Sequence, residues 1–359
     1  MKLRLGFVGG GLNSAVGYTH FAASQMDGLF EVVAGCFSRD AGKNIETGRH
    51  FGVPVSRTYS DLSLMLSDSI GTLDAICILT PTPAHADMVI QCLDAGFNVI
   101  CEKALATSQA ECNAIIAAQQ RANRFLGVTF NYAGYPMVRE MRQIILSGRL
   151  GSVQQVFCEM PQDSFSRDGA SPQSWRKLDY VIPCVSLDLG VHVYHLVTYV
   201  AGISEPRDTL VKTASFGVVA DVVDTVALLS DFDRNVLASM MWGKAVLGYR
   251  NGLRIRVCCE KGSLEWLQTN PELLRYTTAD GVMRDLDRGN PDLLVANDLR
   301  YNRFKAGHPA GFIEAFANVY ADFHAALVAK TPPNDITYFT GEAAEKGIAF
   351  LESLTLSGS

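Results

Sequence analysis

The sequence of 359 residues lacks a long uninterrupted apolar run. The apolar stretch 214–230 is broken by Asp221 and Asp224, and a membrane-spanning helix needs about 20 apolar residues in succession. The first residues, MKLRLGFVGGG, are not followed by the apolar run and cleavage site of a signal peptide. We therefore expect a cytoplasmic protein with no membrane partner.

Surplus positive charge is also missing. The chain has 31 Lys and Arg residues against 37 Asp and Glu residues, a formal net charge of −6. No basic stripe or arginine-rich run is present. Binding to nucleic acid depends on such clusters, so we expect no nucleic-acid partner.

Cysteine is present, but not in the patterns that indicate metal sites or disulfide frameworks. The count is odd, the spacings are irregular and no C-x-x-C occurs. Several cysteines lie in apolar stretches such as AICIL and NVICEK. This pattern favours buried free thiols in a reducing compartment, and the lack of clustered ligands argues against zinc.

Apolar runs alternate with helical patterns through residues 1–131. Buried strands are expected at 3–10, 30–38, 73–80, 98–103 and 125–132, with helices at 17–26, 41–52, 84–96 and 108–123. Residues 55–68 are expected to hold a short strand and a helix. Near-continuous apolar strands alternating with helices indicate a parallel sheet covered on both faces, as in nucleotide-binding α/β domains.

The pattern changes after a helix expected within 131–151 and ending at Gly148. Strands are then expected at 153–160, 209–219, 224–232, 236–245, 252–260 and 262–268, interrupted by a helix at 186–202. Short turns between the later strands favour an antiparallel sheet. We predict two domains: an α/β Rossmann domain at 1–131, and an α+β domain at 132–359 with an open, mainly antiparallel sheet.

A glycine-rich turn follows the first expected strand, in the stretch LRLGFVGGGLNSAVGYTH. The fingerprint G-x-G-x-x-G, counted from Gly9 and Gly11, asks for a glycine at position 14, which is Ser14; the next glycine is Gly17. The strand before the turn and the helix after it favour a loop whose N–H groups bind a pyrophosphate. The alternative is a glycine loop with a structural role only.

The second expected strand ends in CFSRD, where NAD enzymes often place an acidic residue for the ribose. The end position here is Ser38, followed by Arg39. These residues would tolerate or prefer the 2′-phosphate of NADP, unless Arg39 is a solvated loop charge. The choice between NAD and NADP stays open.

Two further strand ends carry polar groups. TPTPAH, residues 80–85, lies where ligands bind in open α/β sheets, so His85 could contact cofactor or substrate, or could cap a helix. CEKA, residues 101–104, places Glu102 and Lys103 after an apolar strand. Lys103 could bind a substrate hydroxyl and relay its proton, or could be a surface lysine.

The last cluster lies in SLDLGVHVYHL. Asp188 and His192 are four residues apart and share a helix face, so they could act as an orienting acid and a base. A metal site formed by Asp188, His192 and His195 is conceivable from the residue types. Polar residues in the core or at a cap are the structural alternative.

These motifs, in this order, resemble the glucose–fructose oxidoreductase / inositol dehydrogenase / MocA (Gfo/Idh/MocA) family. The matching elements are the glycine turn, TPTPAH, EKA where the family usually has E-K-P, and DLGVH where it has D-x-G-x-H. GGGLNSAVGYTH, NYAGYPMVR and the segment GHPAGFIEAFANVYADF further resemble a branch similar to scyllo-inositol dehydrogenases, in which the glycine turn is lengthened.

The resemblance implies a role for particular residues. It implies that Lys103 binds substrate and relays a proton, that His192 is the acid/base, and that Asp188 orients His192 and holds a neighbouring hydroxyl. The residues expected to line NAD or NADP are Gly9, Gly11, Leu12, Asn13, Ser38, Arg39, Thr80, His85 and Glu102. The residues expected to contact substrate, besides Lys103, Asp188 and His192, are Tyr132, Trp175, Arg176, Asn251 and His308. No catalytic metal is implied.

The chain also departs from the family pattern. Ala104 replaces the usual proline after Lys103, and bulky YVIPCVSL precedes Asp188 where the family is rich in glycine. The polar stretch 164–175 could close over a substrate.

The implied activity is hydride transfer between a nicotinamide and a ring hydroxyl or ketone of a polyol, inositol or sugar. Two alternatives stay open: an oxidoreductase of nucleotide-linked sugars in polysaccharide synthesis, and a non-catalytic cofactor-binding sensor. Apolar strand segments such as VALLS and LASMMW further suggest a homodimer or homotetramer that buries the open sheet face.

Overall fold

The computed structural model describes residues 1–329 and 334–356. These residues divide into two compact units, residues 1–131 with 312–329 and 334–346, and residues 132–311 with 347–356. The expected second domain at 132–359 is therefore wrong for helix α8 (Phe312–Val328), which packs on α1 (Gly17–Gln25) in the first unit. The physical reason is that α8, although far along the sequence, buries its apolar side chains in the core of the first unit. Tyr320 of α8 is 1% exposed and contacts the Phe30 ring edge-on at 5.6 Å.

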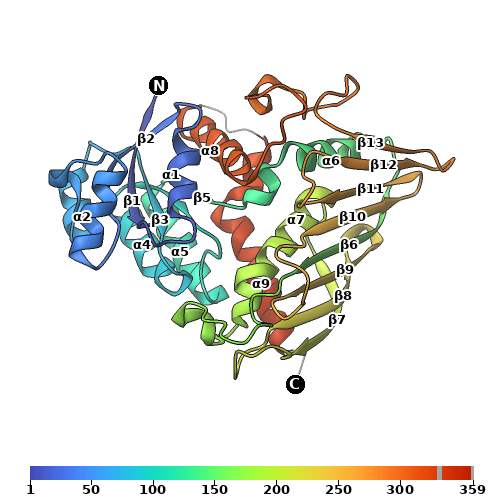
Figure 1. Cartoon of the computed structure of the whole chain (residues 1–359), viewed down its shortest axis with the longest axis horizontal. Helices are drawn as coiled ribbons and strands as arrows, with labels where there is room; N and C mark the ends of the chain where they lie inside the picture. Colours follow the sequence, from blue (N-terminus) through green and yellow to red (C-terminus); the bar gives the residue numbers. More distant parts are fainter. Residues whose placement is uncertain (330–333, 357–359) are drawn as a thin grey trace. The chain divides into compact units, whose positions relative to one another are not determined.

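The first unit is built on a parallel sheet. In the described residues its strand order is β2-β1-β3-β4-β5 (Figure 1). The bounds are β1 Leu3–Gly9, β2 Phe30–Cys36, β3 Ala75–Leu79, β4 Asn98–Cys101 and β5 Leu126–Val128. Every residue of β3 is buried, as expected of a strand covered on both faces. The strand order reverses at β1, with β2 on one side and β3 on the other, and this switch point is where such sheets bind ligands.

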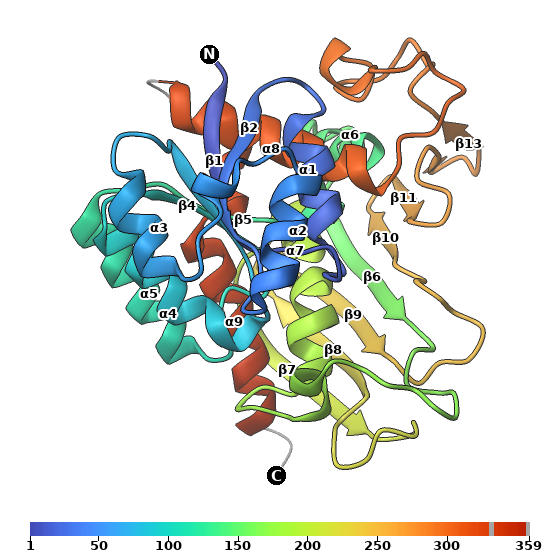
Figure 2. The same cartoon turned by 60° about the vertical axis from the view of Figure 1, so that its left-hand side comes forward.

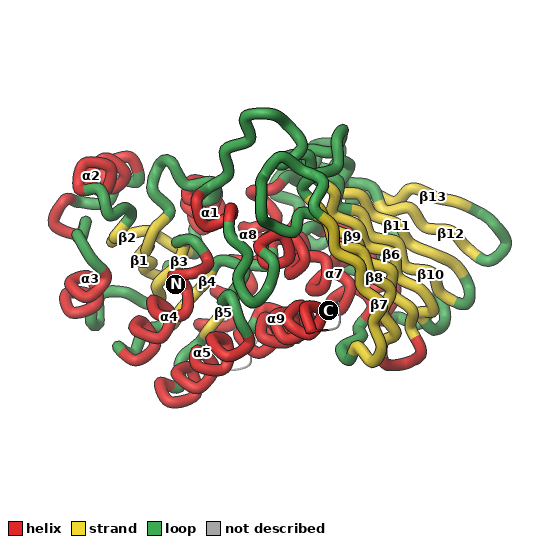
Figure 3. Tube along the Cα trace, turned by 90° about the horizontal axis from the view of Figure 1, so that it is seen from below, coloured by secondary structure: helices red, strands yellow, loops and turns green. Residues whose placement is uncertain are grey.

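Helices cover both faces of this sheet. Besides α1 and α8, their bounds are α2 Ala41–His50, α3 Leu62–Ser69, α4 His85–Asp94 and α5 Gln109–Ala122. The α1/α8 pair and the α4/α5 pair lie on opposite faces (Figure 3). Three helices begin at residues whose side chains accept a main-chain N–H of the first turn, namely Asp40, Asp61 and Ser108.

The strand expected within 55–68 is not formed. Val55–Arg57 makes a single 3-10 turn after Pro54, and Thr58 pairs with Gly35 at one isolated bridge. The pyrrolidine ring of Pro54, with φ of −59°, suits the start of such a turn.

The second unit holds a mixed sheet. In the described residues its strand order is β13-β12-β11-β10-β6-β9-β8-β7 (Figure 1). The bounds are β6 Val153–Pro161, β7 Pro206–Ala214, β8 Thr225–Phe232, β9 Val236–Gly243, β10 Arg254–Cys259, β11 Gly262–Leu267, β12 Leu274–Thr278 and β13 Met283–Leu286. The pairing is antiparallel except between β6 and β9, which is parallel because the chain crosses over through a helix after β6.

The edge strand β13 and its neighbour β12 were not expected from the sequence. Among their residues only Leu274 is buried, so the alternating apolar signal of a half-buried strand is weak there. The expected strand 209–219 is also displaced, since β7 begins at Pro206 and ends at Ala214.

Helices cover one face of this sheet. They are α6 (Pro136–Leu146) and α7 (Val191–Ala201), and α9 (Gly341–Leu356) begins in the first unit and ends in the second (Figure 2). On β8 the side chains alternate between buried Val226 and Leu228 and exposed Ala227 and Leu229, which is the pattern of a sheet packed on one side. Among the described helices, none combines the length and the apolar character needed to cross a bilayer.

Candidate active site

The turn after β1 has the geometry of a phosphate cradle. Gly9 and Gly10 have φ of +79° and +71°, a region that other residues enter only with strain. A Cβ on Gly17 would lie 2.0 Å from the carbonyl oxygen of Gly10. Gly17 is thus the glycine that lets the helix approach the strand closely, the role of the third glycine in the dinucleotide fingerprint.

Ser14, which replaces the expected glycine, is hydrogen-bonded to the main chain where the following helix begins. Its hydroxyl oxygen accepts hydrogen bonds from the N–H groups of Val16 at 3.3 Å and Gly17 at 3.2 Å. The N–H groups of Gly11, Asn13 and Ala15 have no acceptor among residues 1–329 and 334–356. Unpaired N–H groups ahead of a helix favour an anion, so this longer turn fits the pyrophosphate of a dinucleotide.

The end of β2 carries no free carboxylate next to Ser38. The hydroxyl oxygen of Ser38 accepts from the N–H of Asp40 at 3.1 Å, and the Asp40 carboxylate caps α2 through the N–H of Lys43 at 2.9 Å. Arg39 is exposed and forms no ion pair with the described residues. The Arg39 guanidinium group is therefore an exposed cation at this strand end, whereas the Asp40 carboxylate caps α2.

His85 serves the main chain of its own loop. It is 1% exposed, its Nε2 lies 2.7 Å from the Thr80 carbonyl oxygen, and its Nδ1 lies 2.7 Å from that of Ala104. Burial lowers the pKa of His85, although the two carbonyl groups act in the opposite direction. The ring ties the end of β3 to the segment after β4. It opens α4 without acting as its cap, and its contact with a cofactor stays a prediction.

Glu102 lies in a buried polar network at the end of β4. Its Oε1 accepts a hydrogen bond from the Thr129 hydroxyl at 2.6 Å and lies 3.0 Å from His20 Nε2. His20 Nδ1 lies 2.8 Å from the Tyr320 hydroxyl, which lies 3.3 Å from Cys77 Sγ. Burial raises the pKa of Glu102, but the hydrogen bond and charge of His20, with the charge of Lys103, hold it below its usual range.

Lys103 follows this network and is half-buried. The Lys103–Ala104 peptide bond is cis. Cys77, on the neighbouring strand β3, is fully buried and so has no access to solvent. Burial raises the pKa of its thiol to about 12. Lys103 is therefore a side chain at the carboxyl edge of the first sheet that combines a charge with access to solvent.

Asp188 and His192 lie in one helical segment of the second unit. Asp188 belongs to a π-helical turn, Ser186–Gly190, and His192 to the first turn of α7. Their exposed fractions are 8% and 5%. Turns of π-helix inside α-helices are frequent at functional sites, because the extra residue turns side chains toward new directions.

Two cations hold the Asp188 carboxylate. Arg176 donates to Oδ1 at 3.1 Å, and the Lys244 ammonium group donates to Oδ2. Arg176 also stacks on the Trp175 ring at 4.7 Å, and both residues form part of the 3-10 turn Ser174–Lys177. Two of the predicted residues therefore gather around Asp188, Arg176 by direct contact and Trp175 through Arg176.

Tyr132 and Asn251 gather around His192 in the same unit. The Tyr132 ring meets the His192 ring edge-on at 4.7 Å, and Asn251 Nδ2 donates to the Tyr132 hydroxyl at 3.0 Å. Asn251 is held in turn by Gln162, whose Nε2 donates to Asn251 Oδ1 at 3.1 Å. This chain of contacts holds the Tyr132 ring against the His192 ring.

Two residues of the sequence analysis lie apart from these clusters. His308 is exposed, its Nδ1 lies 3.3 Å from the Lys305 carbonyl, and its substrate contact stays a prediction. His195 is buried and stacks on Tyr199 at 6.0 Å. Within the described residues no three His, Cys, Asp or Glu side chains are placed to hold a metal ion, so the conceivable site with Asp188 and His192 is not formed.

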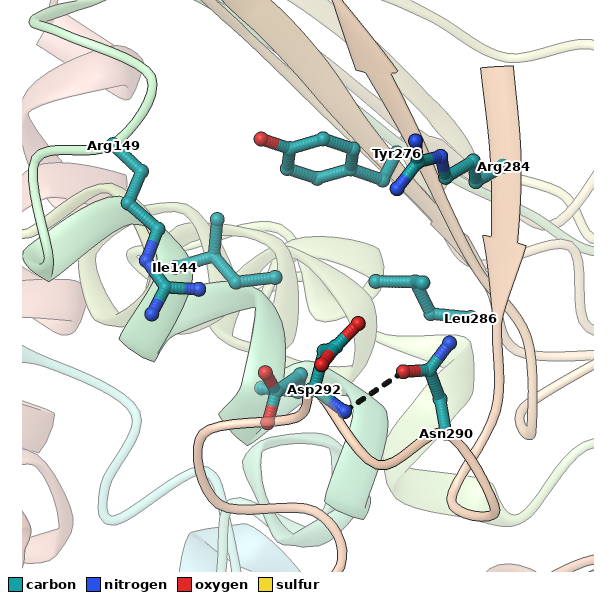
Figure 4. Close-up of a pocket in the computed structure, with 8 residues that line it drawn as sticks. Ile144, Arg149, Tyr276, Arg284, Leu286, Asn290 and Asp292 are labelled. Carbon is teal, nitrogen blue, oxygen red and sulfur yellow. Dashed lines mark hydrogen bonds between the residues drawn. The ribbon is translucent and has the colours of Figure 1, made fainter. Parts of the chain in front are cut away.

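A cavity of about 380 Å³ in the second unit holds none of the predicted catalytic residues (Figure 4). It is lined by Glu140, Ile144, Arg149, Tyr276, Arg284, Leu286, Asn290 and Asp292. The Glu140 carboxylate is committed to the main chain, since it accepts from the N–H groups of residues 294–296 at 2.8–3.0 Å. The cavity is therefore separate from the predicted catalytic residues of this unit.

Lys244 and His20 were missed by the sequence analysis. The sequence gives one weak indication that Lys244 is buried. It continues the every-second-residue pattern of the inward-facing Ala238, Met240 and Trp242. His20 gives no such signal, because its partners Glu102 and Tyr320 are far away in the sequence. Only the folded chain brings these groups together.

The fold and these clusters define a class of protein: a two-unit oxidoreductase whose Rossmann unit binds a nicotinamide dinucleotide. The chain belongs to the Gfo/Idh/MocA oxidoreductase family. Residues 3–130 match its "Oxidoreductase family, NAD-binding Rossmann fold" and residues 138–265 match its "GFO/IDH/MocA C-terminal domain". The predicted family, fold class, enzyme class and cofactor class are thereby confirmed.

Known proteins similar to the chain over most of its length support this assignment. The uncharacterized oxidoreductase YfiI of Bacillus subtilis is 29% identical over 99% of this chain and 95% of that protein. An oxidoreductase structure from Sinorhizobium meliloti is 31% identical, with a TM-score of 0.89 over 99% of this chain and 97% of that one. An inositol dehydrogenase homolog from Azotobacter vinelandii, solved with NADH and myo-inositol, is 27% identical, with a TM-score of 0.90 over 99% and 95% of the two chains.

Proposed function

We propose that this chain transfers a hydride between a nicotinamide and a ring hydroxyl or ketone of a polyol, inositol or sugar. The observation that carries the proposal is the buried pair Asp188 and His192 in the second unit of a nicotinamide-dependent oxidoreductase. A hydride can leave a carbon only as its hydroxyl loses a proton, so such an enzyme needs a positioned base. The similarity to an inositol dehydrogenase homolog solved with myo-inositol supports this substrate class.

His192 is the proposed base. Its ring is held edge-on to Tyr132 in a buried setting, so it presents a nitrogen in a fixed direction and accepts the hydroxyl proton. Positioned acid/base groups contribute rate factors of about 10²–10⁴. Asp188, on the same helical segment, holds a neighbouring hydroxyl and orients the histidine.

Lys103 is the proposed substrate-binding lysine of the first unit. Its half-buried ammonium group donates a hydrogen bond to the reacting oxygen and relays the proton. A nicotinamide, when bound, accepts or supplies the hydride at its ring carbon C4. The unpaired N–H groups of the turn at Gly11, Asn13 and Ala15 would hold its pyrophosphate.

The proposed cofactor range includes NADP as well as NAD. Support comes from the exposed Arg39 guanidinium, and from the Asp40 carboxylate, which caps α2. A guanidinium group binds phosphate through charge-assisted hydrogen bonds, whereas the ribose hydroxyl of NAD calls for a free carboxylate.

Cofactor-reduction assays over a panel of inositols and free aldoses, with NAD and NADP in parallel, test the proposal. We expect turnover of at least one inositol or aldose. Nucleotide-linked sugars form a separate arm of the panel, and turnover restricted to that arm would favour the alternative substrate class. Cofactor binding without turnover in every arm would favour the sensor alternative.

The proposed compartment is the cytoplasm, and the proposed partner is a small molecule rather than nucleic acid. All nine cysteines lie in described residues and none forms a disulfide, which fits a reducing compartment such as the cytoplasm. A net charge of −6 fits a small uncharged substrate better than nucleic acid.

A further inference from the structure

Lys244 is a buried cation at the inward face of the second sheet. It follows β9 directly, its N–H donates to the Asp224 carbonyl at 2.8 Å, and its carbonyl accepts from the N–H of Phe165 at 2.8 Å. The main chain is thus held on both sides, and the side chain is 7% exposed. The ammonium group is therefore held in place as well as withdrawn from water.

Two other carboxylates of this unit are committed to main-chain N–H groups. Asp179 accepts from the N–H groups of Cys184 and Val223, and Asp224 accepts from those of Phe216 and Gly217. Asp188 is the carboxylate that pairs with the ammonium group, and it pairs with Arg176 as well. Burying an ammonium group costs several kcal/mol, and an apolar side chain of similar size is often at least as stabilising. Stability alone therefore gives little reason for a lysine at this position.

The ammonium group keeps donor capacity that the protein does not use. An ammonium group has three N–H donors, whereas Lys244 Nζ donates one hydrogen bond, to the Asp188 carboxylate, and faces the Phe165 ring, whose centroid lies 5.2 Å away. Within residues 1–329 and 334–356, no second oxygen or nitrogen acceptor lies within hydrogen-bond distance of Nζ. Buried donors are normally satisfied, so the geometry calls for an acceptor supplied from outside the chain.

We propose that Lys244 is a substrate-binding residue that forms a donor–acceptor pair with Asp188 for one hydroxyl group. The hydroxyl oxygen accepts a hydrogen bond from Lys244 Nζ, and its hydrogen is donated to the Asp188 carboxylate. A hydroxyl satisfies both partners at once, whereas a carboxylate ligand would meet the repulsion of Asp188. This inference rests on the proposed function, because it names a further contact to the same polyol or sugar.

The test measures equilibrium binding while Lys244 and one ligand hydroxyl are removed, first separately and then together. The NADH-loaded protein is titrated calorimetrically with myo-inositol, scyllo-inositol and D-glucose, and with their monodeoxy analogues. For the wild-type chain, removal of one particular hydroxyl should weaken binding about tenfold or more, the size expected of a hydrogen bond to a charged donor. In Lys244→Met the same removal should change binding less than about twofold.

Two controls separate binding from structure. Lys244→Arg keeps a cation for Asp188, so thermal unfolding should stay close to that of the wild-type chain while the selectivity among deoxy ligands changes. Lys346→Met, at an exposed position of α9, should leave both stability and binding unchanged. If Lys244→Met weakens the parent and deoxy ligands by the same factor, Lys244 is only a counter-ion of Asp188 and the inference is overturned.

Failure of the Lys244 inference can be told apart from failure of the proposed function. Turnover by the wild-type chain without Lys244–hydroxyl coupling overturns the inference alone. Coupling in the binding titrations without turnover of any probe supports the inference and overturns the proposed reaction. Absence of binding by every probe overturns the Lys244 inference directly.

Discussion

His20 Nε2 lies 3.0 Å from Glu102 Oε1, and both side chains are withdrawn from water. This contact joins the helix after the glycine turn to the strand end that carries Lys103. The two elements expected to hold cofactor and substrate are thereby tied together inside the first unit.

Replacing Glu102 should therefore destabilise the first unit in a pH-dependent manner. The pKa of Glu102 is below its usual range, so its contribution to the free energy of unfolding is present above the ordinary glutamate pKa and is lost as pH falls through the lowered value. We expect Glu102→Gln to cost about 1–3 kcal/mol near neutral pH. The difference from wild type should shrink in urea titrations below about pH 4.

The exposed Glu46 in α2 offers the matched control. Glu46→Gln should leave the unfolding free energy unchanged at each pH. An equal loss for both variants would contradict the role assigned to the buried network.

Gly17→Ala should disrupt the cofactor turn. The added Cβ would lie 2.0 Å from a main-chain oxygen of Gly10, and neither backbone segment can give way as a flexible side chain could. Overpacking of this kind costs about 1–3 kcal/mol, and fluorescence titration with NADH should show weakened binding. Gly42→Ala in α2 is the control and should bind NADH as the wild-type chain does. Wild-type NADH affinity in the Gly17→Ala variant would rule out the close approach of helix and turn.

Arg39→Ala should distinguish the two cofactors. Loss of the guanidinium group removes a charge-assisted contact to the 2′-phosphate but no contact to NAD. We expect KM for NADP to rise about tenfold, the equivalent of about 1.4 kcal/mol, while KM for NAD stays constant. The control is Arg49→Ala, at an exposed position of α2, which should change KM for neither cofactor. Equal effects of Arg39→Ala on both cofactors would refute a phosphate contact.

His192→Ala and Lys103→Ala should each reduce kcat by about 10²–10⁴, as expected for loss of acid/base catalysis. NADH affinity should change little in His192→Ala, because the pyrophosphate turn lies in the first unit. His50→Ala, at an exposed position of α2, is the control. Steady-state kinetics and NADH titration together check this, and unchanged kcat in either variant would exclude that residue from the proton transfer.

Leu229→Lys should reduce self-association. Leu229 pairs with Leu210 on the outward side of β8 and β7, and the two side chains are 40% and 70% exposed in the single chain. We expect the wild-type protein to bury this face against a second copy, and a buried lysine would oppose that contact. Light scattering should report a smaller particle than for wild type, whereas Leu64→Lys in α3 should not. A wild-type monomer at micromolar concentration would disprove the expected homodimer or homotetramer.

Local patterns in the sequence determined most of the elements. Fully apolar strands such as Ala75–Leu79 and the alternation along Thr225–Phe232 report whether a strand is covered on two faces or one. The positions of Lys103, Asp188 and His192 after strands or on one helical segment also follow from local order, and with the family resemblance they indicate the chemistry. The short-range signal fails in strands with few buried residues, as in Leu274–Thr278 and the edge strand Met283–Leu286.

Only the tertiary structure decided which distant groups meet. The return of α8 to the first unit, the contact of Tyr320 with His20, and the pairing of Lys244 with Asp188 all join residues more than 50 positions apart. No periodicity encodes such contacts, because they depend on how whole elements pack. The physical reason is that a buried charge or polar group must find its partner across the core, and that partner is chosen by the fold rather than by neighbours in the sequence.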